Sequence, residues 1–135
     1  MRGQAAFEYV VIVSIALIIL LLLWVQENTM VGDNKMGLQR SYSLHSVSRL
    51  KAASDTVYVQ GEPAKFTVMV TFPLGVESVS ISNHEISIRT SSAAGTADAI
   101  ATTLGPVSGS LSTGPGAHRV TVRMNGTKVL ITEGE

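Results

Sequence analysis

Three patterns of apolar and polar positions follow one another along the chain. Residues 5–25 are almost entirely apolar, residues 38–60 place an apolar side chain at every third or fourth position, and from Lys65 onward apolar and polar residues alternate. The first two patterns are typical of α-helix and the third of half-buried β-strands. The sequence therefore predicts an α+β protein with a long hydrophobic N-terminal helix followed by a small antiparallel β-sheet or sandwich as a head domain.

The first segment is long enough to cross a membrane. About 20 residues of α-helix cover about 30 Å, the thickness of one hydrocarbon core. Glu8 is the one charge within this segment, and Trp24 lies at its far end, where amphipathic aromatics favour the water interface. A carboxylate in hydrocarbon costs roughly 2.5–3.5 kcal/mol on insertion scales and usually marks a functional pairing. The segment is apolar all round, so periodicity does not single out a buried face.

The stretch 26–37 is polar and contains two glycines, Gly32 and Gly37. Glycine is a poor helix former, so the pair predicts a hinge, a kink or a locally melted turn. A short flexible linker out of the membrane explains the same residues equally well.

Helical spacing returns after residue 38, and Gly61 with Pro63 supplies the expected stop signal. Residues 55–60 are also compatible with a strand, but the apolar stripe continues in phase, which favours helix to Gln60. The predicted buried stripe consists of Leu44, Val47, Leu50, Ser54 and Val57 with Tyr58.

Alternation predicts strands at 65–72, 79–81 and 86–88. Residues 73–75 form a turn between the first two. Asn83-His84 is read as the two-residue loop of a hairpin, which places Ile81 opposite Ile86 and Val79 opposite Ile88.

The stretch 91–117 is small and polar, and predicts one short strand at 106–112 between surface loops. Asn125-Gly126 then gives the strongest hairpin signal, a type I′ turn between two alternating segments. Its register places Val122 opposite Val129 and Val120 opposite Ile131.

Composition and motifs argue against several classes of function. Ten basic and ten acidic residues give no net charge, whereas nucleic-acid binding needs a basic surface. The chain has no cysteine, and none of its histidines has the spacing of a metal site, so we expect no metal and no cofactor. Its three histidines are read as surface or turn residues: His45, His84 and His118. Nucleotide-binding and hydrolase motifs are missing, so enzyme activity has no positive support.

The N-terminus of the chain does not resemble a secretory signal that is removed. No small-residue cleavage site follows Trp24, and the better candidate for a cut lies between Gly3 and Gln4. Such a cut removes a leader of residues 1–3 and leaves the hydrophobic helix on the mature protein. A free amine at Gln4 then lies about 6 Å along the helix axis from Glu8.

The residues Gly3-Gln4-Ala5-Ala6-Phe7-Glu8-Tyr9, followed by an apolar run, resemble the class III signal peptide of archaeal type IV pilins. In that family a prepilin peptidase cuts after the Gly, the Gln becomes the first residue, and a Glu follows four positions later. Gln4 and Glu8 match both positions, and the short leader carrying Arg2 matches as well. The signature covers about the first 25 residues, while residues 50–65 resemble the helix end and first strand of archaeal pilin heads more weakly.

The resemblance implies a structural subunit of an archaeal type IV-like pilus, used for adhesion. Helices would pack in the filament core, β heads would coat it, and Glu8 would pair with the Gln4 amine of a neighbouring subunit and set the axial stagger. Implied partners are other copies of the chain, the membrane before assembly, the prepilin peptidase, an assembly ATPase and a platform protein. The implied localisation is the cell membrane for the precursor and then an extracellular surface filament. The expected filament-core residues are Phe7, Val11, Ile15, Ile18 and Leu22.

The corresponding division of the chain is a leader at 1–3, a helix at 4–60 and a β head at 61–135. One alternative is a single-span, membrane-anchored β-domain that binds a partner. Another is a different filament component of the same kind, a pseudopilin or an archaellin. Asn125-Gly126-Thr127 is in addition a candidate N-glycosylation sequon, although a turn alone already explains its Asn-Gly pair.

Overall fold

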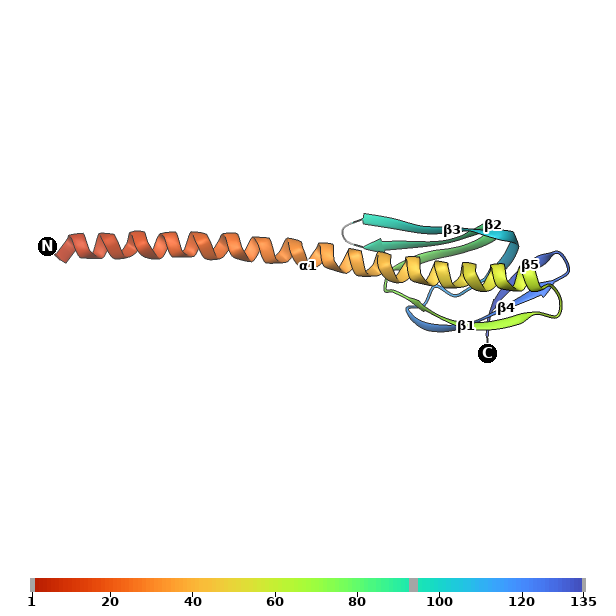
Figure 1. The fold of residues 1–135 in the computed structure, drawn as a ribbon. Coiled ribbons are helices and arrows are strands. Elements are labelled where there is room, and N and C mark those ends of the chain that lie inside the picture. The colour runs from red at the N-terminus through yellow and green to blue at the C-terminus, as the bar shows by residue number, and fades with distance from the viewer. Residues whose placement is uncertain (1, 93–94, 135) are drawn as a thin grey trace. The chain divides into compact units, whose positions relative to one another are not determined.

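The computed structural model describes residues 2–92 and 95–134, with the side chains of residues 2, 3, 5 and 28–35 left undescribed. It contains one helix and five strands within these residues: α1 (Arg2–Gln60), β1 (Lys65–Phe72), β2 (Val76–Ser92), β3 (Gly95–Ser110), β4 (Gly116–Asn125) and β5 (Lys128–Glu133) (Figure 1). The chain forms two compact units, Met1–Lys35 and Met36–Glu135. The predicted α+β class, with a long helix first and a sheet after it, is confirmed.

The two glycines do not interrupt the helix. Helical backbone continues through Gly32 and Gly37 to Gln60, so neither the locally melted turn nor the flexible linker is present. The division between the two units nevertheless falls after Lys35, inside the glycine-containing stretch. Residues 36–60 therefore belong to the same compact unit as the strands.

Gly61 ends α1 as the sequence predicts. It adopts φ 70° and donates its N–H to the Val57 carbonyl at 3.0 Å, while its own carbonyl accepts the Ala64 N–H at 2.9 Å. A positive φ is available to glycine without a Cβ clash, so this residue closes the last turn and redirects the chain into β1.

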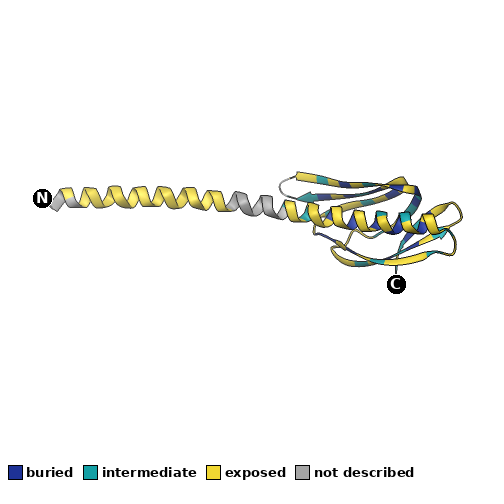
Figure 2. Ribbon diagram, in the orientation of Figure 1, coloured by how far each residue is buried: buried dark blue, intermediate teal, exposed yellow. Residues whose placement is uncertain are grey.

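The second part of α1 buries a stripe of its side chains against the strands (Figure 2). Val47, Leu50, Ser54 and Val57 are buried as predicted, but Leu44 is 45% exposed and Tyr58 is 38% exposed. The remaining buried positions are small residues, namely Ser43, Ser46 and Ala53. Small side chains allow the helix backbone to approach the sheet closely, so a stripe chosen by large apolar residues alone is displaced toward solvent at Leu44 and Tyr58.

The strands form one five-stranded sheet in the order β1-β4-β5-β3-β2. β1 has the predicted bounds, 65–72, and pairs antiparallel with β4. The sheet is not wholly antiparallel, because residues 107–110 of β3 run parallel to 129–132 of β5. Figure 1 shows the second part of α1 between β1 and the β2–β3 pair.

Polar side chains of α1 bind backbone groups on both flanks of the helix, on β1 at one side and on β3 at the other. Ser46 Oγ and Arg49 Nη1 donate to the carbonyls of Thr71 and Met69 on β1, at 2.7 and 2.9 Å. On the other flank Asp55 accepts the Leu104 N–H at 2.8 Å. β1 is an edge strand, and its free carbonyls need partners when they are covered. The helix supplies these partners, which fixes its position between the two flanks.

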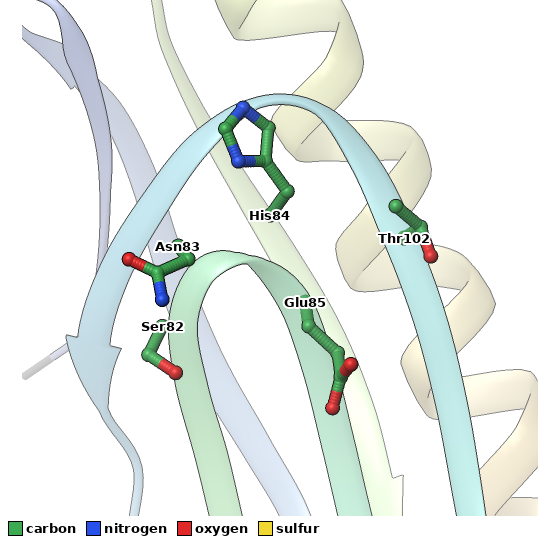
Figure 3. Close-up of a pocket in the computed structure, with 5 residues that line it drawn as sticks. All are labelled: Ser82, Asn83, His84, Glu85 and Thr102. Atoms are coloured by element: carbon green, nitrogen blue, oxygen red, sulfur yellow. The ribbon is translucent and has the colours of Figure 1, made fainter.

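The chain turns back within β2 at the predicted place. Figure 3 shows the ribbon of β2 reversing direction between Ser82 and Glu85, where Asn83 adopts φ 55°. Ser91 donates its N–H to the Gly75 carbonyl at 2.7 Å, so the two ends of β2 meet. Ile81, Ile86 and Ile88 are all buried, as the alternation predicts.

The stretch 91–117 is where the sequence-based prediction fails most. β3 occupies 16 of these residues, whereas only a short strand at 106–112 is predicted. Its buried positions are Ala99, Thr103, Gly105 and Val107, and its large residues Ile100 and Leu104 are 55% and 64% exposed. Period-two alternation is present in burial but not in hydrophobicity, because the inward side chains are small.

The β4–β5 hairpin exists, but its predicted register is shifted by two residues. Val122 lies opposite Ile131 and Asn125 opposite Lys128, so the loop is Gly126-Thr127 rather than Asn125-Gly126. Gly126 alone in this loop has a positive φ, 63°, which is the pattern of a type II′ turn and not of type I′. A shift by two keeps every side chain on its face, so the predicted core residues Val120, Val122, Val129 and Ile131 are nevertheless buried.

Leu50 and Leu44 offer a direct test of the packing, since they lie on the same helix and differ in burial, at 0% and 45% exposed. We expect Leu50→Ala to lower the free energy of unfolding of the second unit by about 2–5 kcal/mol, because the change leaves a cavity. Leu44→Ala should cost less than about 1 kcal/mol. Urea unfolding of the full chain in a non-ionic detergent, followed by the methyl NMR signals of Val122 and Ile131, measures both. Equal losses for the two variants would contradict this packing.

Candidate functional site

The first unit has one dominant feature, an apolar helical segment that the described chain leaves uncovered. Ala6–Glu27 is 22 residues long, and every one of its residues is exposed (Figure 2). A helix of that length spans roughly 33 Å, so it is long and apolar enough to cross a membrane. Trp24, at its end, is 66% exposed. In water such a surface is unfavourable, so an apolar environment that covers it would stabilise the segment.

The five predicted filament-core side chains lie on one side of this helix. At about 100° per residue, these positions fall within an arc of about 80°. All of them are exposed: Phe7 71%, Val11 40%, Ile15 53%, Ile18 58% and Leu22 65%. They therefore form a continuous apolar stripe that is available to a neighbour.

Glu8 lies beside that stripe and has no hydrogen bond or ion pair to any described residue. It is exposed, and together with Phe7, Val11 and Ile12 it lines a shallow hollow of about 310 Å³ on the helix surface. Gln4 is exposed too and precedes Glu8 by one helical turn. Of the two residues at the predicted cleavage position, the exposure of Gln4 alone can be stated, since the surroundings of Gly3 are outside the described residues.

Ser14 is a polar residue inside the apolar run, and its hydroxyl forms a hydrogen bond within the helix. Its hydroxyl donates to the Val10 carbonyl at 2.8 Å. A hydroxyl paired in this way can enter hydrocarbon without an external partner. Glu8 is the one charged residue between Gln4 and Gln26, so it is the side chain of this stretch that needs a partner charge in an apolar environment.

The second unit carries a polar hollow at the reversal of β2 (Figure 3). Ser82, Asn83, His84, Glu85 and Thr102 line it, and its volume is about 330 Å³. All five residues are exposed. Among the described residues there is no group of three or more His, Cys, Asp or Glu side chains that could hold a metal ion. The hollow lacks the buried, converging polar groups that typically fix a small ligand.

Asn125 lies at the exposed tip of the β4–β5 hairpin, as the sequence predicts. Thr127, the third residue of the sequon, is exposed beside it. The Gly126 N–H donates to Glu62 Oε1 at 2.8 Å, which holds the turn against the end of α1. The sequon is therefore presented on a fixed, accessible turn.

His45 and His84 are exposed as predicted, but His118 is not a surface residue. Its side chain is 13% exposed and its ring lies 4.9 Å from the ring of Phe72. Nδ1 is 2.6 Å from Glu133 Oε1 and 3.3 Å from Ser112 Oγ, while Nε2 is 2.6 Å from the Gly114 carbonyl. The three residues are separated by 6 and 15 positions in the sequence, a spacing that carries no motif, so sequence reasoning missed this cluster.

The Ser112–His118–Glu133 cluster does not have the geometry of a catalytic triad. In a triad the serine and the acid bind opposite nitrogens of the imidazole, so that one nitrogen accepts the serine proton while the acid orients the ring and stabilises the imidazolium. Here Ser112 and Glu133 both face Nδ1, and a backbone carbonyl occupies Nε2. Ser112 Oγ donates to Glu133 Oε1 at 2.9 Å, which ties the serine to the carboxylate.

Comparisons of the chain with protein-family models, with curated proteins and with solved structures gave no match. A functional proposal for this chain therefore depends on its own residues and geometry.

The sequon gives a first test that is independent of assembly. We expect protein recovered from its native cells to carry a glycan on Asn125, because the acceptor is exposed on a fixed turn. Thr127→Ala destroys the sequon and should remove the added mass, whereas Thr127→Ser preserves it and should keep the mass. Intact-mass analysis of the three proteins measures this, and identical masses for native protein and Thr127→Ala would contradict it.

Proposed function

We propose that this chain is a structural subunit of an archaeal type IV-like pilus, a surface filament used for adhesion. The observation that carries the proposal is an uncovered apolar helix, Ala6–Glu27, in which the Glu8 carboxylate, one turn after Gln4, has no partner among the described residues. A plain membrane anchor needs the first feature and is weakened by the second. A filament core built from identical helices uses both.

In this proposal the helix is held first by lipid and then by the helices of other subunits. The two environments are about equally apolar, so transfer between them changes little in hydrophobic burial. Packing of the stripe and pairing of charges must therefore select the filament. A cut between Gly3 and Gln4 creates an amine, and Glu8 of the next subunit is the carboxylate that can neutralise it.

The second unit fits the role of a head that coats the filament. Its hydrophobic core contains side chains from residues 47–57 of α1 and from the strands, and none from residues 6–27. The head does not need the apolar segment for its core, which leaves that segment free for other contacts. Assembly would involve a prepilin peptidase, an assembly ATPase and a platform protein.

A permanent single-span anchor carrying a β-domain is the competing function, and the length of Ala6–Glu27 favours it equally. Pseudopilins and archaellins share the same N-terminal features, so the residues described separate them poorly from pilins. The carboxylate distinguishes a filament from an anchor, since an anchor gains nothing from Glu8.

Substitution of Glu8 tests the proposal. We expect Glu8→Ala to reach the membrane in normal amounts and to abolish filaments, because the neighbouring amine loses its partner in an apolar core. Glu27→Ala is the matched control, since it removes a carboxylate at the other end of the same segment, and it should assemble normally. Electron microscopy of cells and immunoblots of membrane fractions measure both outcomes. Normal filaments from Glu8→Ala would contradict the proposal and favour the anchor.

A further inference from the structure

A partly buried histidine joins three separate segments of the second unit. His118 lies on β4, Glu133 is the last residue of β5, and Gly114 belongs to the loop of residues 111–115 that connects β3 to β4. Ser112, in the same loop, donates both its hydroxyl and its N–H to the Glu133 carboxylate, at 2.9 and 3.2 Å. The histidine, the loop and the end of β5 are thus connected through one side chain.

Both ring nitrogens of His118 face oxygen atoms that can only accept. Nδ1 is 2.6 Å from a Glu133 carboxylate oxygen, and Nε2 is 2.6 Å from the Gly114 carbonyl oxygen. A neutral imidazole has one donor and one acceptor, whereas the imidazolium has two donors. Because Glu133 has a lowered pKa and is ionised at neutral pH, the doubly protonated ring is the form that satisfies both contacts.

We propose that His118 is a pH-operated latch, which fastens the loop of residues 111–115 to the end of β5 while its ring is doubly protonated and releases the end of β5 when the ring becomes neutral. The latch belongs to the head alone and does not depend on whether the chain assembles into a filament.

Ser112 determines which contact is lost. When Nδ1 loses its proton, its lone pair repels the Glu133 carboxylate, but it can accept the Ser112 hydroxyl, whose oxygen is 3.3 Å away. Nε2 keeps its proton and its bond to Gly114. Glu133 then loses its hydrogen bonds to the ring and to the Ser112 hydroxyl and keeps the Ser112 N–H. The neutral form is therefore the Nε2–H tautomer, with the end of β5 released and the ring still bound to the loop.

The surroundings of the ring contain one titratable partner among the described residues. β5 supplies Glu133, β1 supplies Phe72 and Val70, and the loop supplies backbone and Ser112. Arg119 follows on β4 and is exposed, with its side chain on the opposite face of the strand. The charge balance of the latch is thus that of a single His–Glu pair.

The pKa directions set the pH range of the closed latch. Burial opposes the charge on His118, but the hydrogen bonds to Glu133 and Gly114 and the charge of Glu133 outweigh it, so the pKa of His118 is raised above 6.5. Hydrogen bonds from His118 and Ser112 lower the pKa of Glu133 below 4.5. The stabilisation that the histidine contributes to the closed latch is complete below pH 6.5 and is lost as pH rises through its raised pKa. That of the glutamate is lost as pH falls through its lowered pKa, so the latch is closed between these two limits.

Nitrogen NMR of the histidine rings in the full chain, in detergent micelles between about pH 5 and 9, tests the latch. We expect His118 to hold two ring protons to a higher pH than an unperturbed histidine, whose pKa is about 6.5, and then to keep the proton on Nε2. In parallel, hydrogen-exchange protection of the Gly134 amide, which donates to the Arg119 carbonyl at 2.7 Å, should fall as the ring deprotonates. Between the low-pH and the high-pH limit, the ratio of molecules with an open latch to those with a closed latch should rise. The rise is about tenfold for each unit by which the pKa of His118 in the closed state exceeds its pKa in the open state.

Glu133→Gln separates the latch from a merely structural contact. The side-chain amide can donate to a neutral Nδ1, so protection of Gly134 should persist across the same pH range and lose its pH dependence. The control His84→Gln removes an exposed histidine and should keep the native pH dependence. Three results would each overturn the latch: a His118 ring that titrates no higher than an unperturbed histidine, a neutral ring protonated on Nδ1, or unchanged pH dependence in Glu133→Gln.

Discussion

The segment Ala6–Glu27 imposes the constraint on which the other features of this chain depend, because it has an apolar surface that the described residues do not cover. Lipid and identical helices are both suitable coverings, and they differ little in the hydrophobic energy that they supply. Hydrophobicity therefore brings the segment out of water without deciding which covering it takes. The Glu8 carboxylate distinguishes the two coverings better, since burying a carboxylate in an apolar environment is costly unless a partner charge neutralises it.

The head is compatible with that constraint because it meets its own structural needs. Residues 36–60 of α1 supply one side of its core, and small residues such as Ser46 and Ala53 allow the helix to approach the strands. Ser46, Arg49 and Asp55 satisfy backbone groups on the two flanks of the helix. The head can therefore remain folded whichever covering the first segment has.

The sequence predicts the parts of the fold that large apolar residues or a single glycine determine. The apolar segment, the end of α1 at Gly61 and the bounds of β1 all follow from such signals. Residues 95–105 of β3 could not be predicted as a strand, because their inward positions are alanine, threonine and glycine. The exposure of Leu44 has the same cause, since serines occupy the face that packs on the sheet.

Contacts between distant residues are the second class that the sequence does not reveal. A two-residue shift of the β4–β5 register leaves the apolar alternation unchanged, so alternation cannot detect it. His118 meets Glu133 because β4 and β5 pair, and Gly114 because the preceding loop folds back. In the candidate site, Glu8 and Gln4 are visible in the sequence as a local pair one turn apart, whereas the partner of Glu8 would belong to another chain.

The most direct measurement of the central claim is the N-terminal mass of protein sheared from the cell surface, combined with electron microscopy of the same material. A reusable helix, held first by lipid and then by other subunits, predicts fibres whose subunits begin at Gln4, with the leader of residues 1–3 removed. Protein that retains Met1 and stays in the membrane fraction, with no fibres in the sheared material, would contradict it.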